Sequence, residues 1–339
     1  MANTECLPIP TSWYALAFSD ELPPGAVITR QLVGQAIVLY RTQSGQACAI
    51  DAFCPHLGAH FGYGGSVHGE EIRCPFHGFR FDLQGRCTAT GYGTKPPPKA
   101  RTRRWPLREV NGILFAWYDS RGAPPEWDIP VLTMEGWSPI IHQAFELKDH
   151  PQETVENGVD IGHFGIVHGY SAVEVRRKLV ADGPSFQVAY AACRPLPVVG
   201  RLGAQVHFDF ELNIHGLGFS LVKVAVPRYQ LESRLFVLAT PIEQHCVVLH
   251  LGLSMKYLTS GAQIHPLLVL LPRRWLTRAI GRIIHAGLVY DARQDFVIWE
   301  HKRYLSAPAL AEGDGPIGRY RRWARQFYHE ARVPEVVEQ

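Results

Sequence analysis

The alternation of apolar and polar residues divides the chain into two regions of different character. From residue 13 to about 119, short apolar stretches alternate with turn residues, which predicts β-strands at Ala26–Leu32, Ala36–Tyr40, Ala47–Asp51 and Ile113–Tyr118. The last stretch follows an Asn-Gly pair, a dipeptide typical of hairpin turns. This first region is therefore expected to be a small β-domain.

The second region mixes strand-like and helical patterns. Alternating runs predict strands at Gln205–Leu212, Phe219–Val226 and Cys246–Leu253. The spacing of apolar residues predicts helices around Glu153–His163 and Arg273–Val289. The chain as a whole is therefore expected to be α+β.

A connector that contains Pro and Gly, Arg121–Pro130, separates the two regions. We expect a β-domain at residues 1–120, a linker at 121–140 and a second domain at 141–339. A chain of 339 residues with 46% hydrophobic and 19% charged residues has room for two cores and is typical of soluble enzymes.

Charge and signal patterns exclude several classes of protein. With 34 basic against 31 acidic residues, the net charge of +3 argues against a nucleic-acid binder. The N-terminus lacks the features of a signal peptide, and the apolar stretch Pro266–Pro272 is too short for a transmembrane segment. No G-x-G-x-x-G follows a strand, so electrons from NAD(P)H are expected to arrive only through another protein. We expect a cytoplasmic location.

The chain has seven cysteines, an odd number. Five of them show no paired spacing and are expected to be reduced thiols, as in cytoplasmic proteins. They are Cys6, Cys48, Cys87, Cys193 and Cys246.

The other two cysteines stand in short motifs that also contain histidine. The sequence is C-P-H-L-G from Cys54 and C-P-F-H-G from Cys74, with seventeen residues between His56 and Cys74. Two Cys and two His, including His77, suit a structural zinc site or the Rieske type of 2Fe-2S cluster, in which two His replace two Cys on one iron. Zinc fingers pair Cys with Cys and His with His, whereas each half here mixes the two, which favours the Rieske cluster.

A second histidine pair lies in the sequence E-N-G-V-D-I-G-H-F-G-I-V-H, which ends at His168. His163 and His168 would be about 140° apart on an ideal helix, so the helix must either widen into a π-turn or stop between them. Two imidazoles and a carboxylate with open positions form the facial triad of non-haem Fe(II) oxygenases. The best candidate carboxylate is Asp295, with Asp291 and Glu300 as weaker choices.

A histidine pair alone is more often structural than metal-binding, but a Rieske cluster supplies single electrons that a mononuclear iron would consume. With both motifs present, the chain from about Trp13 to about Tyr304 resembles the oxygenase component of Rieske non-haem iron oxygenases. It is nearest to monooxygenase-type members, the 3-ketosteroid 9α-hydroxylase oxygenases and cholesterol 7-desaturases. The matching signatures are Cys54-x-His56, Cys74-x2-His77, Asn157-x2-Asp160-x2-His163-x4-His168 and Asp295.

The resemblance implies a Rieske β-domain followed by a helix-grip catalytic domain, assembled as a head-to-tail homotrimer. It implies that Asp160 bridges the cluster ligand His77 of one subunit and the iron ligand His163 of the next, and Asn157 is a further candidate for a catalytic role. Electrons would come from a ferredoxin or reductase, and O2 would be the co-substrate. The implied ligands are Cys54, His56, Cys74 and His77 for the 2Fe-2S cluster, and His163, His168 and Asp295 for Fe(II).

The implied reaction is oxidation, most simply hydroxylation, of a hydrophobic steroid-like or polycyclic substrate. The alternatives are O- or N-demethylation of a small aromatic, tailoring of a natural product by desaturation or cyclisation, and a non-enzymatic electron carrier. Three apolar runs fit either a substrate pocket or ordinary strand core. They are Phe208–Phe210, Leu217–Leu221 and Leu235–Leu238.

Two basic stretches complete the pattern. Lys95–Arg104 is expected to be a solvated loop, with attraction of an acidic ferredoxin as the alternative. Arg273–Val289 interleaves Arg with apolar residues and is expected to pack over the second domain, with contact to a membrane surface as the alternative.

Overall fold

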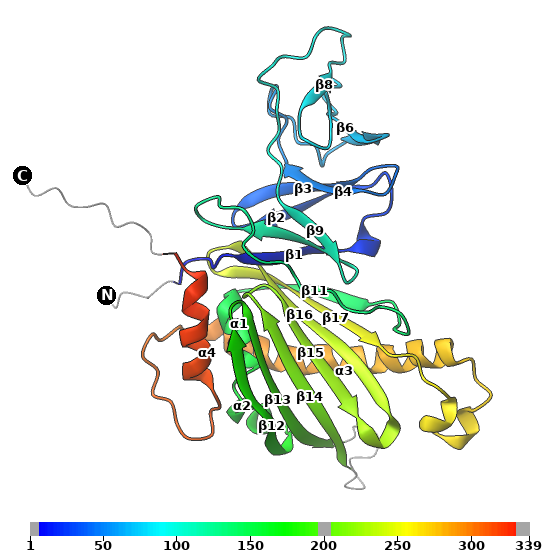
Figure 1. Ribbon diagram of the computed structural model, residues 1–339, viewed down its shortest axis with the longest axis vertical. Coiled ribbons are helices and arrows are strands. Elements are labelled where there is room, and N and C mark those ends of the chain that lie inside the picture. The colour runs from blue at the N-terminus through cyan, green and yellow to red at the C-terminus, as the bar shows by residue number, and fades with distance from the viewer. Residues whose placement is uncertain (1–6, 196–204, 330–339) are drawn as a thin grey trace, which may run out of the picture.

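The computed structural model describes residues 7–195 and 205–329 (Figure 1). The first region folds into three small antiparallel sheets, with the strand orders β1-β10-β9, β2-β3-β4 and β5-β6-β7-β8. These strands are β1 Ser12–Phe18, β2 Val27–Leu32, β3 Gln35–Arg41, β4 Ala47–Asp51, β5 Ser66–His68, β6 Glu71–Arg73, β7 Arg80–Phe81, β8 Cys87–Ala89, β9 Leu107–Val110 and β10 Ile113–Tyr118. The four strands predicted in this region are confirmed within one residue at each end.

The second region is built on one seven-stranded antiparallel sheet in the order β11-β17-β16-β15-β14-β13-β12. Its strands are β11 Ile141–Leu147, β12 Ser171–Asp182, β13 Ser185–Pro195, β14 Gln205–His215, β15 Ser220–Val226, β16 Leu231–Glu243 and β17 Cys246–Met255. The α-helices are α1 Pro151–Asn157, α2 Gly162–Ile166, α3 Arg273–His301 and α4 Ile317–Ala324. Short 3-10 helices are η1 Ser19–Glu21, η3 Pro227–Tyr229, η4 Gly261–Gln263, η5 Pro266–Leu268 and η6 Arg325–Phe327. The expected α+β class is confirmed.

The Asn-Gly hairpin forms as the sequence predicts. Asn111 and Gly112 both have positive φ, at 58° and 77°, and Val110 pairs with Ile113 across the turn. Two successive residues with positive φ are the requirement of a type I′ turn, whose twist matches that of the flanking strands. The turn therefore fixes the register of β9 on β10.

The two regions share a hydrophobic core. Buried side chains of β1 and β10, such as Trp13 and Phe115, pack with Phe219 and Phe236 from the large sheet. At Gly218 the backbones approach so closely that a Cβ atom would lie 2.0 Å from the carbonyl oxygen of Trp13. The first region therefore stands on one end of the large sheet, as Figure 1 shows. We call the part of this region with β5–β8, which carries the two Cys-His motifs, the cluster-motif lobe.

The prediction of one continuous helix around Glu153–His163 is wrong. Helix α1 ends at Asn157 and α2 begins only at Gly162. Two tertiary contacts hold the break. A Cβ at Gly158 would lie 2.9 Å from Leu212, and the N–H of Ile161 donates to the carbonyl oxygen of Asp314. Neither partner can be read from the local pattern.

Helix α3 packs on the sheet with its buried residues Leu276, Gly281 and His285, so the expectation for Arg273–Val289 is confirmed. It runs twelve residues further than the predicted helix, to His301. Within the described ranges, no helix combines the length and apolar character needed to cross a bilayer.

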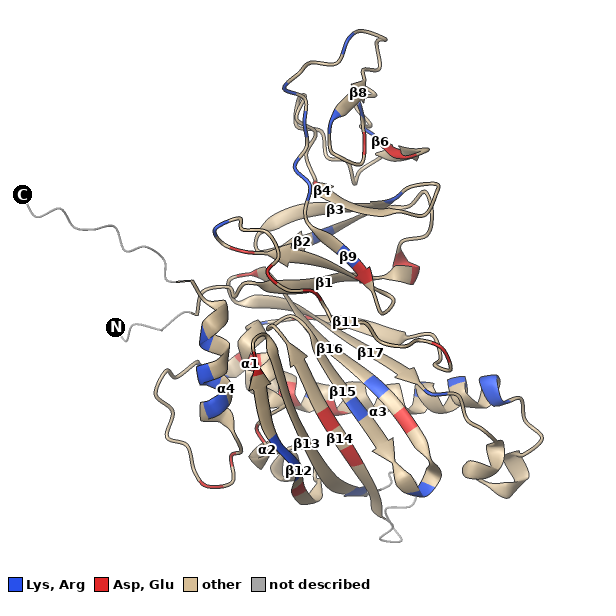
Figure 2. Cartoon of the chain, in the orientation of Figure 1, with Lys and Arg blue, Asp and Glu red and all other residues tan. Residues whose placement is uncertain are grey.

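The basic loop also lies where the sequence places it. Its side chains at Lys95, Lys99, Arg101, Arg103 and Arg104 are exposed, as expected of a solvated loop. Figure 2 shows basic residues on the loop beside β8 and at one end of α3.

The connector Arg121–Pro130 contains no helix or strand, as expected. It is not loose, because Trp127 packs against Trp117 and Phe327 and its carbonyl oxygen accepts from the indole of Trp13. All cysteines in the described ranges have free thiols, which agrees with the expectation for Cys48, Cys87, Cys193 and Cys246. Cys6 lies outside the described residues.

Candidate metal centres

Two loops of matching geometry carry the Cys-His motifs. In each loop the cysteine carbonyl accepts a hydrogen bond from the glycine four residues later, Gly58 or Gly78. The cysteine N–H in turn donates to the residue five positions later. Both glycines have positive φ, at 74° and 65°, a conformation that glycine adopts without strain. The repeated C-P-x-x-G pattern therefore forms the same turn twice.

The loops bring the four predicted side chains to one end of the lobe. The rings of His56 and His77 have centroids 4.7 Å apart, and His56 stacks on Phe79 at 4.3 Å. The side chains of Cys54 and Cys74 are buried, at 3% and 2% exposure. Burial raises the pKa of the Cys54 thiol to about 12. Two buried thiols and two adjacent imidazoles are the donor types that an iron–sulfur cluster of the Rieske type takes, so the residues present fit such a cluster.

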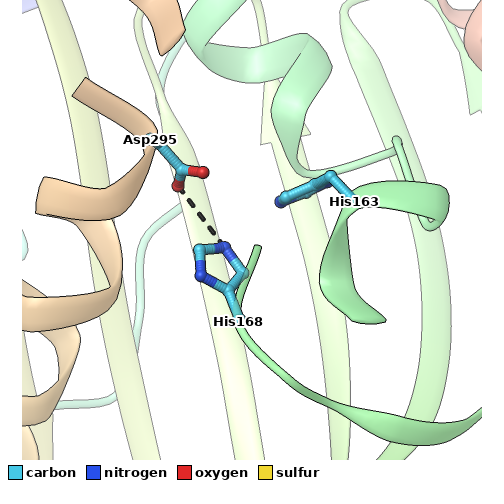
Figure 3. Close-up of side chains that lie close together, drawn as sticks. All are labelled: His163, His168 and Asp295. Atoms are coloured by element: carbon cyan, nitrogen blue, oxygen red, sulfur yellow. Dashed lines mark ion pairs between the residues drawn. The ribbon is translucent and has the colours of Figure 1, made fainter. Parts of the chain in front are cut away.

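The second histidine pair meets Asp295 from α3. One ligand atom from each of His163, His168 and Asp295 lies within 4.8 Å of the others (Figure 3). The Nε2 atom of His168 is 3.5 Å from the Asp295 carboxylate, and the two imidazole centroids are 5.1 Å apart. Helix α2 ends at Ile166, between the two histidines, so of the two sequence-level alternatives the helix stops rather than widens.

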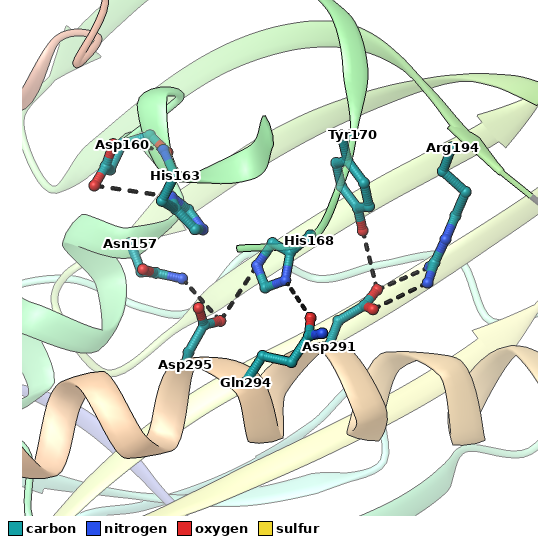
Figure 4. A network of polar contacts seen from close by, with 9 residues as sticks. All are labelled: Asn157, Asp160, His163, His168, Tyr170, Arg194, Asp291, Gln294 and Asp295. Atoms are coloured by element: carbon teal, nitrogen blue, oxygen red, sulfur yellow. Dashed lines mark hydrogen bonds and ion pairs between the residues drawn. The ribbon is translucent and has the colours of Figure 1, made fainter. Parts of the chain in front are cut away.

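Both imidazoles are oriented by a hydrogen bond from Nδ1. His163 donates to the carbonyl oxygen of Asp160 at 2.5 Å, and His168 donates to Oε1 of Gln294 at 3.0 Å (Figure 4). These bonds place the proton on Nδ1 and leave the Nε2 lone pair free, as a metal ligand requires. The Nε2 atom of His163 is buried and has no hydrogen-bond partner among the described residues. Such an orphaned acceptor costs free energy unless something binds it, so the donor set fits a metal ion.

The other two candidate carboxylates have different surroundings. Asp291 pairs with Arg194 at 2.8 and 3.0 Å and accepts from the hydroxyl of Tyr170 at 3.0 Å (Figure 4). Both of its oxygens are therefore already satisfied. Glu300 is exposed and lines a separate surface cleft. Only Asp295, at 5% exposure, joins the histidines.

Asp160 and Asn157 flank this group. The Nδ2 group of Asn157 donates to Asp295 at 3.2 Å. The carboxylate of Asp160 accepts from the backbone N–H of His163 at 3.3 Å and lies 3.8 Å from its Nδ1. Burial opposes ionisation of Asp160, but its contacts with His163 outweigh burial and lower its pKa. The carboxyl group is therefore charged at neutral pH, and about a third of its side chain faces solvent.

A mostly apolar cavity lies beside the histidines, between the large sheet and α1, α2 and α3. Polar groups enter it only at a few points, including Thr154, Asn157 and Asp291. Two of the apolar runs noted in the sequence contribute alternate apolar side chains. The third contributes only Ser220, because Leu217 and Leu221 are core residues. The lining side chains from β14, β15 and β16 are Phe208, Phe210, Leu212, Ser220, Val222, Val224, Leu235 and Val237.

Two known family models match the chain. Residues 12–100 match the Rieske [2Fe-2S] domain, and residues 116–328 match the 3-Ketosteroid 9alpha-hydroxylase C-terminal domain.

Known proteins resemble the chain over most of its length. It is 32% identical to a cholesterol 7-desaturase of Xenopus laevis, over 94% of this chain and 72% of that protein. It is 28% identical to the oxygenase component of a 3-ketosteroid-9-alpha-monooxygenase of Rhodococcus rhodochrous, over 93% of this chain and 83% of that protein. The crystal structure of dicamba monooxygenase bound to dicamba superposes with a TM-score of 0.66 and 19% identity, over 93% of this chain and 96% of that one. At that identity the superposition shows the fold alone.

The fold and the two donor sets thus define a Rieske-type oxygenase, an oxidoreductase. More particularly, the chain belongs to the Rieske oxygenase family that carries the 3-ketosteroid 9α-hydroxylase C-terminal domain, and cholesterol 7-desaturases are among its relatives. Its Rieske domain implies a 2Fe-2S cluster, and the oxygenase relatives use a mononuclear iron.

Proposed function

We propose that the protein is the terminal oxygenase of a multicomponent system, and that it hydroxylates a hydrophobic, steroid-like substrate with O2. The observation that carries this proposal is the apolar cavity directly beside His163, His168 and Asp295. The names of the relatives, cholesterol 7-desaturase and 3-ketosteroid-9-alpha-monooxygenase, point to the same class of substrate. Electrons come from a ferredoxin or a reductase, because the chain carries no dinucleotide-binding fingerprint.

In this proposal each donor set holds one metal group. The 2Fe-2S cluster takes Cys54, His56, Cys74 and His77. The Fe(II) ion takes His163, His168 and Asp295, and supplies O2 activation when it is bound. The chain's own task is to orient the two imidazoles through Gln294 and the carbonyl of Asp160, and to exclude water around the substrate. The proposed domain division, at 1–120, 121–140 and 141–339, assigns one metal group to each domain.

The cavity also suggests how a steroid-like molecule would be oriented. Strand residues of β14, β15 and β16 provide mostly apolar walls, whereas Ser220 and Asn157 provide polar groups. A molecule with a rigid apolar body and one oxygen function matches such a lining, because the polar groups fix its orientation and the walls bury its rings.

We further propose the head-to-tail trimer. The rim of the cluster-motif lobe exposes large apolar side chains, which is unusual for a surface without a partner. Ile166, next to the candidate iron site, is 90% exposed. Docking of one rim on the α1–α2 face of a neighbour would cover both patches and bring His77 to Asp160. The rim residues are Phe53, Leu57, Tyr63, Phe76 and Tyr92.

Replacing Asp160 by Asn is expected to keep both metal groups and to slow electron transfer from cluster to iron by about 10- to 100-fold, the usual effect of losing a carboxylate behind a metal ligand. Asn keeps the shape but removes the charge that faces His163. The measurement is cluster reoxidation in a single turnover, followed by stopped-flow absorbance. Glu174→Gln, an exposed acid of β12, is the control. An unchanged rate in Asp160→Asn would remove the bridging role.

Product analysis tests the proposed reaction. The reconstituted protein, with a ferredoxin and its reductase, is incubated with progesterone, testosterone or cholesterol under labelled O2. We expect one labelled oxygen atom in the steroid product. A new double bond without label would indicate desaturation, and formaldehyde from methoxy- or N-methyl aromatics would indicate the demethylase alternative. Two irons per chain without a third would support an electron carrier.

A further inference from the structure

A buried carboxyl group, Asp149, lies between the metal-site cavity and the surface. Asp149 is only 6% exposed and lies just before α1. The hydroxyl of Thr154 donates to its Oδ2 at 2.5 Å, and Oδ1 has no hydrogen-bond partner among the described residues. Thr154, at 3% exposure, lines the cavity together with His163 and Asp295. The hydrogen bond from Thr154 therefore links the Asp149 carboxyl to a residue of the cavity wall.

The other side of Asp149 faces a surface cleft. This cleft and the cavity share Trp299 as a wall, and Asp149 belongs to the cleft whereas Thr154 belongs to the cavity. The hydrogen bond between them thus crosses from one space to the other. The other titratable or charged residues of the cleft are Lys148, His150, Glu153, His245, Glu300, Lys302, Arg303 and Tyr304.

Helix geometry explains why Thr154 reaches the cavity. Thr154 and Asn157 are three residues apart in α1 and so lie on the same face of the helix. Asn157 is the residue whose amide donates to Asp295. Thr154 therefore lies one helical turn before a residue that contacts a candidate iron ligand.

Asp149 is suited to exchange protons near neutral pH. Burial raises the pKa of Asp149 to about 7. The Thr154 hydroxyl, the backbone N–H of His150 and the charge of Lys302 oppose this rise, whereas Glu153 adds to it. The neighbouring His150 is not suited, because burial lowers its pKa to about 4 and its Nε2 bonds to the carbonyl of Pro8. Of the two buried groups, only the carboxyl populates both protonation states at neutral pH.

We propose that Asp149 and Thr154 form a proton relay from the surface cleft into the metal-site cavity. While the carboxyl is ionised, the Thr154 hydroxyl donates to Oδ2. When Asp149 has taken a proton from water in the cleft, the hydroxyl turns its own proton to an acceptor in the cavity and accepts the carboxyl proton in its place. The inference rests on the proposed function and deepens it. Hydroxylation balances as RH + O2 + 2 e⁻ + 2 H⁺ → ROH + H2O, in which the reductase supplies the electrons and the relay supplies the protons. A hydrophobic substrate excludes water from the cavity, which is why a route through the wall is needed.

Substitutions that keep the shape of the pair test the relay. Asp149→Asn keeps an acceptor for the Thr154 hydroxyl but cannot carry the proton, and Thr154→Val removes the hydroxyl with little change of volume. Each is expected to lower kcat about 10²-fold with KM nearly unchanged, as for loss of a positioned proton donor. Thr154→Ser should restore most of the rate. Glu300→Gln, in the same cleft, is the matched control and should behave as the wild type.

The pH profile separates a relay from a structural role. In the wild type, kcat should fall as pH rises through about 7, because Asp149 loses its proton there. Asp149→Asn should lack this limb. The substrate is progesterone, or cholesterol if progesterone is not oxidised. Hydrogen peroxide is measured together with the product, because slow proton delivery uncouples O2 consumption from substrate oxidation.

A readout without turnover uses protein that lacks the mononuclear iron. Infrared difference spectra should show a protonated carboxyl that titrates near pH 7 in the wild type and is absent in Asp149→Asn. The pKa of Asp149 is higher in the folded than in the unfolded chain, where it is about 4. The wild type should therefore lose stability relative to Asp149→Asn as pH rises from about 4 to about 7.

The outcomes distinguish the two proposals. Normal rates and pH profiles in Asp149→Asn and Thr154→Val, beside an active wild type, would overturn the relay alone. The absence of the titrating carboxyl band would also overturn it. A wild type with both metal groups that oxidises no substrate offered would overturn the proposed function, and the relay with it.

Discussion

Replacing His163 by Ala is expected to abolish substrate oxidation and mononuclear iron binding while leaving the Rieske-type spectrum unchanged. The imidazole provides the orphaned Nε2 acceptor, and neither His168 nor Asp295 can replace its position. Anaerobic Fe(II) at 100 times its Kd should stabilise the wild type by about 2.7 kcal/mol and the variant by much less. Metal analysis, electron paramagnetic resonance of the reduced cluster and thermal unfolding with and without Fe(II) provide the measurements.

The control for this substitution is His285→Gln. His285 is 8% exposed on α3, the helix that carries Asp295, but its Nε2 lies 3.5 Å from the carbonyl of Leu251 and it does not line the cavity. It should keep iron and activity. If His163→Ala retained the Fe(II)-dependent stabilisation, the assignment of this donor set would be wrong. If a folded variant lost the cluster instead, the assignment of one metal group to each domain would fail.

The parts of the site that were predictable are those written in short local patterns. Cys54 and Cys74 each begin a C-P-x-x-G turn, and the turn needs only its own residues to form. The Asn111-Gly112 hairpin was predictable for the same reason, because Asn and Gly alone meet its requirement for two successive residues with positive φ. Asp295 was predictable from the resemblance to a family, and the structure places it beside the two histidines.

The parts that were not predictable depend on contacts between distant segments. Gln294 orients His168 across 126 residues of sequence, and no local pattern marks it. Arg194 neutralises Asp291, which is why this carboxylate is satisfied although it lies one turn from Asp295. The break after α1 depends on Leu212 and Asp314 in the same way. Sequence periodicity predicts which side of a helix or strand is buried, but it does not predict which distant side chain packs against that side.

Replacing Cys74 by Ser is expected to abolish the 2Fe-2S cluster and, with it, all turnover that depends on the reductase. The Cys74 thiol is buried beside Cys54, and a serine oxygen is a hard donor that binds cluster iron far less well than a thiolate. The mononuclear iron should remain, because its proposed ligands come from α2, α3 and the segment that follows α2. The measurements are acid-labile sulfide, iron content and the absorbance of the oxidised cluster.

Cys87→Ser is the matched control because it lies in the same lobe. Cys87 packs against the core cluster that contains Cys54 and Cys74, but its thiol bonds to the carbonyl of Ala89 instead of facing the two histidines. Its replacement removes a thiol from the lobe without touching the predicted ligands, so sulfide and spectrum should be retained. A Cys74→Ser protein that kept two sulfides per chain would refute the ligand assignment. Loss of the cluster in both variants would show that the lobe tolerates no substitution there. The Cys54→Ser variant would then separate loss of a ligand from loss of the fold. Loss of a ligand leaves the mononuclear iron bound, whereas loss of the fold removes it.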